Sequence, residues 1–134
     1  MRQEGSIAVE TAVIAPVLLV LMLLVVYAGR AAQADADVQS AAARAARAAS
    51  LVDSAQLAED TATTTATRNL DTAGVACRQL RVEVDATRLA AGGTVTVDVA
   101  CELANTTIAG LAVPGTRWSI ATATEVVDTH RGGG

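Results

Sequence analysis

Residues 12–29 form a continuous apolar run without a single charged side chain. As a helix this run would extend over roughly 27 Å, close to the ~30 Å hydrocarbon thickness of a bilayer. Pro16 lies near its start, where membrane helices tolerate proline. The run therefore predicts a transmembrane helix, which we bound at residues 6–29. It leaves room for one small domain in the rest of the 134-residue chain.

An acidic residue, Glu10, lies at the N-terminal end of this apolar segment. A charged side chain in a membrane helix costs a few kcal/mol and usually has a partner, yet no arginine or lysine lies within one turn of Glu10. Cleavage between Gly5 and Ser6 would give Ser6 a free ammonium group on the same helix face, four residues before Glu10. The sequence therefore indicates that proteolysis supplies the cation, in the same chain or in an adjacent copy. The alternative is an uncut signal anchor whose Glu10 lies near the lipid headgroups.

The opening GSIAVETAVIAPVLLVLMLLVVYAGR, residues 5–30, resembles that of the TadE-like proteins. These are minor pilins or pseudopilins of the tight-adherence (Flp, type IVb) pilus system. The resemblance lies in a short hydrophilic leader ending in glycine, the Ala-Val-Glu motif at residues 8–10, and the Pro-Val-Leu-Leu run at residues 16–19. Thr11 stands where such proteins often carry phenylalanine, which makes helix packing at that turn less certain.

The resemblance implies a prepilin leader, residues 1–5, that prepilin peptidase removes by cutting between Gly5 and Ser6. The mature protein would remain in the bacterial cytoplasmic membrane as a single-pass protein with its C-terminal part outside, and would serve assembly of an adhesive Tad/Flp pilus. Glu10 would then pair with an N-terminal charge during assembly. The implied partners are the peptidase, other pilins or pseudopilins through the N-terminal helix, the pilus platform proteins and the lipid bilayer. Placement at the tip, along the shaft or only in the membrane, and N-methylation of Ser6, stay open.

Two other functions stay open at this point. One is a major structural pilin subunit, although such subunits are usually little more than the helix. The other is a small secreted binding domain released by a signal peptidase after Ala34, because residues 32–34 fit a small-residue cleavage site.

Catalysis finds little support in the sequence, and we expect no enzyme. His130 is the single histidine, no Gly-rich phosphate loop is present, and no cofactor or metal site is expected. The carboxylates of Glu83, Asp85 and Asp98 are interpreted as a solvated strand face. A net charge of −4 without a basic cluster argues against nucleic acid as a partner.

Residues 30–73 are predicted as an extracytoplasmic helical region. They begin with an alanine-rich stretch free of glycine and proline, so the transmembrane helix should continue outward. A seam with alternating spacings of four and three residues is suited to close helix contact. Its members are Val38, Ala42, Ala45, Ala49 and Val52. The seam packs on the chain's own globular part, on other helices in a filament, or on both at different positions, and the sequence does not divide them.

A break in this helical region is predicted near residues 50–53. Asp53 and Gln56 resemble a capping box, which predicts a second helix from Ser54 to about Leu70, with its stop at Ala73-Gly74. A loosely ordered linker is the alternative.

Residues 74–130 are predicted as an antiparallel β subdomain, followed by a flexible tail at residues 131–134. Residues 80–85 and 95–101 alternate apolar and polar side chains around a Gly92-Gly93 turn, and residues 118–127 supply a third strand. The single apolar face should cover the upper helix. The predicted fold is therefore α+β and pilin-like: a long N-terminal helix with a three-stranded sheet packed on its upper part.

The register that pairs the apolar faces places Val84 near Val95 and Cys101 opposite Arg78. Cys77 and Cys101 lie beyond the membrane segment, where a disulfide is the simplest interpretation and buried free thiols are the alternative. A bridge requires Cys77 to lie at an irregular strand entry. Residues 103–116 are expected to form a connecting loop. Asn105 begins a glycosylation sequon whose use the sequence leaves open.

Overall fold

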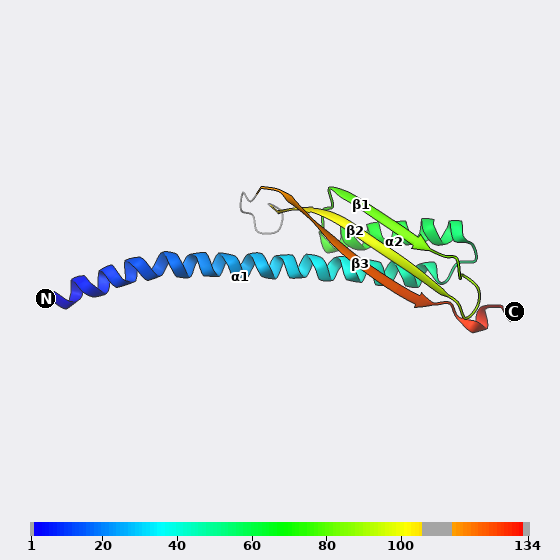
Figure 1. The fold of residues 1–134 in the computed structure, drawn as a ribbon, viewed down its shortest axis with the longest axis horizontal. Coiled ribbons are helices and arrows are strands. Elements are labelled where there is room, and N and C mark those ends of the chain that lie inside the picture. Colours follow the sequence, from blue (N-terminus) through cyan, green and yellow to red (C-terminus); the bar gives the residue numbers. More distant parts are fainter. Residues whose placement is uncertain (1, 106–113, 133–134) are drawn as a thin grey trace.

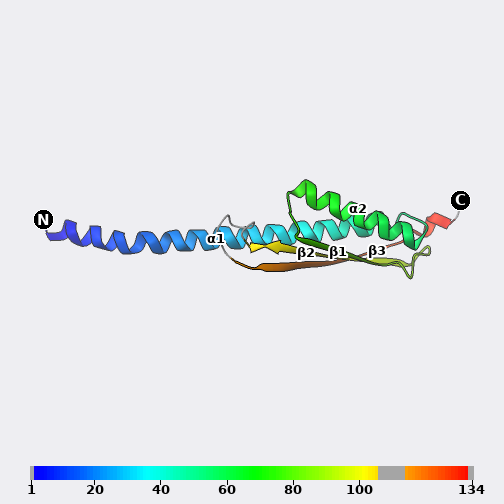
Figure 2. The ribbon, with the colours of Figure 1, turned by 90° about the horizontal axis from the view of Figure 1, so that it is seen from above.

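The computed structural model describes residues 2–105 and 114–132. Its elements are α1 (Arg2–Ala49), α2 (Ala55–Ala73), β1 (Gln79–Asp85), β2 (Thr94–Ala104), β3 (Thr116–Val126) and a short 3-10 helix, η1 (Thr129–Gly132). The N-terminal half of α1 extends away from the rest of the chain, and α2 and the sheet gather along its C-terminal half (Figure 1). Both helices lie on the same side of the sheet (Figure 2). The predicted α+β fold, with a long helix and a three-stranded antiparallel sheet, is confirmed.

Helix α1 runs without a break from the apolar segment into the folded part. Pro16 lies inside the helix and does not end it, although proline removes one backbone hydrogen bond. The alanine-rich stretch after Arg30 has high helix propensity. The prediction that the apolar helix continues into the alanine-rich stretch is therefore confirmed.

The C-terminal half of α1 is buried along a stripe wider than the predicted seam. The fully buried positions are Val38, Ala41, Ala42, Ala45, Ala46 and Ala49. Val52 lies beyond the end of the helix and is half-buried against the same core. The stripe is wide because α2 packs on one side of α1 and the sheet on the other (Figure 2). The seam thus packs on the chain's own globular part, which is the first of the three alternatives.

Helix α2 begins and ends at defined caps. Ser54 is the N-cap. Its backbone is extended, and its hydroxyl oxygen accepts a hydrogen bond from the backbone N–H of Leu57 at 3.2 Å. The capping box predicted at Asp53 and Gln56 is wrong, because the Gln56 side chain donates forward to Asp60 at 3.4 Å. The C-cap is Gly74, whose φ of 76° is accessible to glycine and costly for other residues. The predicted stop is confirmed, and the segment is a helix instead of a loose linker.

Alanines on α2 make its contact with α1 close. The buried residues of α2 recur every four positions: Ala58, Ala62, Ala66 and Leu70. Side chains this small let two helix axes approach nearer than leucine-lined faces would. The helix pair therefore needs no aromatic residue to fill it, in keeping with a chain that contains no phenylalanine.

The sheet has the order β1-β2-β3 with antiparallel neighbours. The apolar faces pair as predicted, but the predicted register is wrong by two residues: Val84 lies opposite Val97, and Cys101 lies opposite Leu80. The loop between β1 and β2 occupies residues 86–93. β1 ends at Asp85, whose carboxylate accepts the backbone N–H of Thr87 at 3.1 Å and begins the first turn of the loop. The first residues of β2 therefore pair with β3 alone.

The third strand is confirmed and begins two residues earlier than predicted, at Thr116. Strand β2 continues to Ala104, so the expected loop at residues 103–116 is shorter at both ends, and its residues 106–113 lie outside the described residues. After β3, the carboxylate of Asp128 accepts the backbone N–H of His130 at 2.9 Å and starts η1. Of the expected flexible tail, residues 131 and 132 belong to η1, and residues 133–134 lie outside the described residues.

The β1–β2 loop is packed so tightly at Gly93 that only hydrogen fits there. A Cβ atom at this position would lie 1.9 Å from the carbonyl oxygen of Arg88 and 2.9 Å from that of Ala90. We expect Gly93→Ala to lower the free energy of unfolding by about 1–3 kcal/mol, the usual cost of overpacking. The measurement is denaturant unfolding of the full-length protein in detergent, followed by the fluorescence of Trp118, the single tryptophan.

The matched control is Gly29→Ala. A Cβ atom at Gly29 meets no heavy atom within 4 Å, and alanine has the higher helix propensity. This variant should unfold at the wild-type midpoint or slightly above it. A wild-type midpoint for Gly93→Ala would contradict the loop geometry.

Candidate functional site

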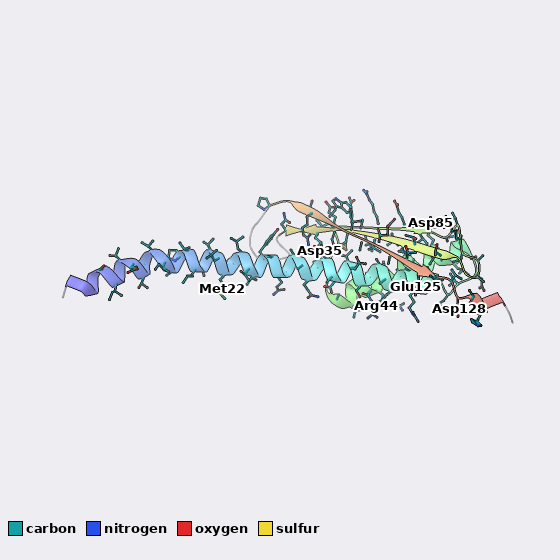
Figure 3. The ribbon with its side chains drawn as sticks, turned by 60° about the horizontal axis from the view of Figure 1, so that its bottom comes forward. Met22, Asp35, Arg44, Asp85, Glu125 and Asp128 are labelled. Carbon is teal, nitrogen blue, oxygen red and sulfur yellow. A yellow bond between two sulfur atoms is a disulfide. The ribbon has the colours of Figure 1, made fainter. Side chains whose placement is uncertain are left out.

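The N-terminal half of α1 carries apolar side chains with no partner in the described chain. The large apolar residues from Ile7 to Val26 are 40–71% exposed, and Figure 3 shows them projecting from the helix on several sides, Met22 among them. Exposing this area to water would cost about 25 cal/mol for every Å². Among the described residues, α1 is the one helix long and apolar enough to cross a membrane. The apolar segment therefore indicates membrane association.

Gly5, Ser6 and Glu10 all lie within α1, at the exposed start of the apolar segment. A Cβ atom at Gly5 would meet nothing within 4 Å, so the fold itself does not require glycine there. Within the described part of the chain, the carboxylate of Glu10 forms neither a hydrogen bond nor an ion pair. Ser6 and Glu10 are four residues apart on a continuous helix, and therefore lie one above the other on one face.

Cys77 and Cys101 are joined by a disulfide. Cys77 precedes β1, and the backbone N–H of Arg78 already donates to the carbonyl of Glu102 at 2.7 Å. This irregular entry brings Cys77 to the buried Cys101 even though Leu80 is the strand partner of Cys101. The bond closes a loop of about 25 residues, worth roughly 3.5 kcal/mol in the chain-entropy model. It ties the end of the helical region to the central strand.

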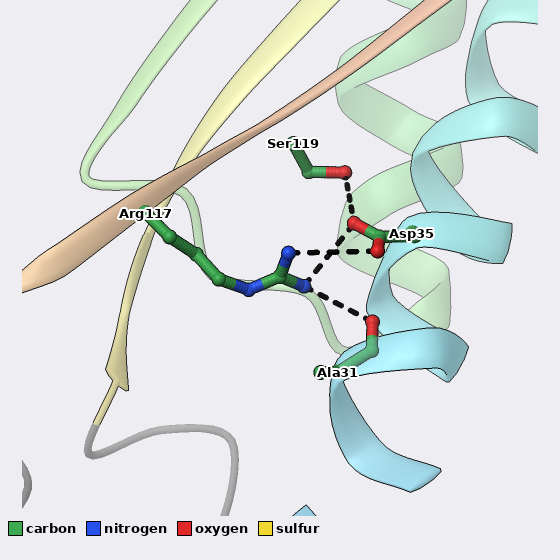
Figure 4. Close-up of polar contacts among 4 residues, drawn as sticks. All are labelled: Ala31, Asp35, Arg117 and Ser119. Atoms are coloured by element: carbon green, nitrogen blue, oxygen red, sulfur yellow. Dashed lines mark hydrogen bonds and ion pairs between the residues drawn. The ribbon is translucent and has the colours of Figure 1, made fainter. Parts of the chain in front are cut away.

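A polar contact joins the start of β3 to α1, and sequence analysis missed it. The guanidinium of Arg117 donates to the carboxylate of Asp35 at 3.1 Å and to the carbonyl of Ala31 at 3.0 Å. The hydroxyl of Ser119 donates to the same carboxylate at 2.6 Å. Figure 4 shows these four residues converging between the helix and the strand; we call this group the Asp35 clasp. Arg117 and Ser119 alternate with Trp118, which puts both on the helix-facing side of β3.

The charge of the Asp35 carboxylate is compensated within the clasp, whereas the buried Nε of Arg117 has no hydrogen-bond partner among the described residues. The hydrogen bond from Ser119 and then the guanidinium of Arg117 hold the pKa of the Asp35 carboxyl below its ordinary value, against the opposing effect of partial burial. A second contact between α1 and β3, from Arg47 to Glu125 at 3.6 Å, is more exposed and contributes little. The clasp therefore fixes against α1 the end of the sheet that lies nearest the apolar segment.

The predicted acidic strand face is present on the side of the sheet away from the helices. Glu83 and Asp98 are direct cross-strand partners, and Asp98 accepts a hydrogen bond from the hydroxyl of Thr122 on β3. Asp85 lies at the end of β1 and bonds Thr87 within its own loop. The structure therefore places Glu83 and Asp98 side by side and directs Asp85 into a turn.

The lowered pKa of Asp35 gives the clasp a defined pH dependence. The unfolded carboxyl has a pKa of about 3.9; the clasp contributes its full stability above that value and loses it as pH falls through the lower folded-state pKa. We expect Asp35→Asn to lower the unfolding temperature of the detergent-solubilised protein at pH 7. The difference from wild type should shrink as the pH is lowered below about 4. A difference that stays constant with pH would show that the carboxylate charge is not what holds the contact.

Comparison with protein families finds a match for the N-terminal part of the chain. The family described as TadE-like protein matches residues 5–47, which include Gly5, Ser6, Glu10, the apolar segment and the Asp35 half of the clasp. Comparison with curated proteins and with solved structures gave no significant match. The resemblance seen in the opening of the sequence is confirmed: residues 5–47 match the TadE-like protein family.

Proposed function

We propose that this chain is a minor pilin or pseudopilin that supports assembly of an adhesive Tad/Flp type IVb pilus. Prepilin peptidase cuts it between Gly5 and Ser6, and the remaining helix holds it in the cytoplasmic membrane. Its role is structural and not catalytic. Its partners are the peptidase, other pilins or pseudopilins that pack against the apolar half of α1, and the platform proteins of the pilus.

The observation that carries this proposal is the carboxylate of Glu10, which has no partner among the described residues and lies on an apolar, exposed stretch of helix. A charged group costs about 3 kcal/mol at the bilayer midplane on insertion scales, and less toward the interface. The cut frees an ammonium group at Ser6, one helical turn away, that offsets this cost within a chain or between neighbouring copies. The fold gives Gly5 no packing role, which fits a residue selected by a protease.

The disulfide supports an orientation with the folded part outside the cytoplasm. Disulfides form and persist in oxidising compartments, and Cys77 and Cys101 both belong to the part that follows the apolar segment. The same reasoning places residues 1–5 on the cytoplasmic side, where the peptidase acts. The proposed topology is therefore a single pass with the sheet outside.

The packing of α1 weighs against the secreted-domain alternative. Cleavage after Ala34 would remove the Ala31 carbonyl that Arg117 binds, and Ala34 itself packs against the core. The major-pilin alternative differs from the proposed role in copy number. A shaft subunit would be present in purified pili in at least as many copies as any other pilin, whereas a minor pilin would be present in far fewer.

Changing Gly5 tests the processing step. In the native host, Gly5→Leu should leave the unprocessed chain in the membrane fraction, because the peptidase needs a small residue before the cut. Gly5→Ala is the matched control and should still be processed. The measurement is the mass of the membrane-bound protein, and a Gly5→Leu chain that begins at Ser6 would refute the proposed cleavage.

Changing Glu10 tests the charge pairing separately. Glu10→Val should be inserted and processed normally, because it removes a costly charge, yet cells carrying it should lose their pili. Glu59→Val, on the exposed side of α2, removes a carboxylate far from the apolar segment and should leave piliation unchanged. Pili are counted by electron microscopy, with the mature mass confirmed for each variant. Wild-type pilus numbers with Glu10→Val would rule out the pairing.

A further inference from the structure

Trp118 lies on the outer face of the sheet, where most neighbours are polar. Its side chain is on the opposite side of β3 from the clasp and the residue is 38% exposed. The guanidinium carbon of Arg81, on β1, lies over the ring at 4.9 Å from its centroid. The folded part of the chain thus presents an indole and a cation together at its surface, and neither the pilus function nor the core uses them.

The clasp fixes how far Trp118 lies from the end of the apolar run. Its chain neighbour Arg117 binds the carbonyl of Ala31 and the carboxylate of Asp35. These two helix positions lie about 3–9 Å beyond Gly29, at 1.5 Å per residue. The polar headgroup layer on each side of a bilayer is about 5–8 Å thick. With α1 across the membrane, Trp118 therefore lies at the depth of the lipid headgroups.

The other aromatic residue of the chain lies close to the same level. The sequence contains one tryptophan, one tyrosine and no phenylalanine. Tyr27 lies on α1 one turn before Ala31, at the end of the apolar run. Tryptophan and tyrosine are enriched at membrane–water interfaces, where the ring is accommodated among headgroups and its polar atom stays hydrated. Both aromatic residues of this chain thus lie where a bilayer would place them.

Three arginines near Trp118 and Tyr27 form no ion pair with another described residue. Among the ion pairs of the described residues, Arg30, Arg78 and Arg81 take no part. Arg30 immediately follows the apolar run, Arg78 directly precedes β1, and Arg81 is the third residue of β1. A guanidinium binds a lipid phosphate well because its donors form a planar fork.

The geometry points to a lipid-binding surface formed by Trp118 and Arg81, which contacts phospholipid headgroups and holds the sheet against the membrane. This inference rests on the proposed insertion of α1. Tyr27 marks the same interface on the helix side. The surface gives the folded part a second attachment to the bilayer, in addition to the transmembrane helix.

The single tryptophan makes the contact directly measurable. The full-length protein is placed in nanodiscs of phosphatidylcholine and phosphatidylglycerol, and Trp118 fluorescence is quenched by a headgroup spin label, a mid-chain spin label or aqueous iodide. We expect the headgroup label to quench Trp118 most and iodide to quench it weakly. Arg81→Gln should reduce the headgroup quenching, and most strongly in discs rich in phosphatidylglycerol.

Two matched variants in a Trp118→Phe background complete the design. Thr124→Trp moves the indole along the same outward face of β3, away from the membrane, and should be quenched several-fold more by iodide and hardly at all by the headgroup label. Leu21→Trp places it in the middle of the apolar run, where the mid-chain label should quench it most.

Each outcome decides a separate question. Mid-chain quenching of the indole in Leu21→Trp shows that the helix is inserted. If iodide then quenches Trp118 as strongly as it quenches the indole in Thr124→Trp, the headgroup contact is refuted. Without mid-chain quenching of Leu21→Trp, the insertion itself fails, and the inference fails with it. A third measurement is iodide quenching of Trp118 in detergent without phospholipid. If this quenching weakens as the protein concentration rises, the surface binds a second copy of the chain, and the inference is overturned.

Discussion

The burial of an alanine stripe on α1 is the contact from which the rest of the structure follows. From Val38 to Ala49 the helix is enclosed by α2 and the sheet, whereas from Ile7 to Val26 it has no apolar partner in the described chain. One continuous helix therefore has two environments. Alanine permits this division, because a small side chain allows close packing on two sides at once, while the larger leucine and valine side chains of the N-terminal half suit lipid or another helix. The change between them occurs near Arg30, where the charges begin.

At that change of environment, the Asp35 clasp prevents the sheet from pivoting about the helix. The alanine side chains of the stripe are small and form no hydrogen bonds. By themselves they therefore define the position of β3 along α1 only loosely. The carboxylate of Asp35 accepts from two side chains of β3, and Arg117 also binds the helix backbone. Hydrogen bonds to charged groups are stronger and more directional than neutral ones. The disulfide performs the corresponding task between the end of the helical region and β2.

The sequence predicts the elements of this fold well and their mutual positions less well. Alternation and helix propensity are local signals, so the third strand, the second helix and its stop at Gly74 could be read directly. The two-residue register error at Val84 arose because a loop's path depends on contacts such as that of Asp85 with Thr87, which strand alternation does not encode. The clasp was missed for a similar reason: its partners are separated by 82 and 84 positions. The one available signal was Arg117, a charged residue immediately before the predicted third strand and in phase with Ser119 and Ala121 on its inner face; a charge at such a position requires a partner.

Helix structure across the proposed cleavage site raises a last question, because proteases bind extended chains and residues 2–9 are helical. Two features make this end easy to unwind. Gly5 has a helix propensity about 1 kcal/mol poorer than alanine and loses no packing when the helix opens. Farther along, Pro16 cannot donate a hydrogen bond to the carbonyl of Ala12, which separates the first turns from the long helix that follows. The leader can therefore unwind without disturbing the Asp35 clasp or the folded part, and the same helix can serve both as a protease substrate and as a rigid stem.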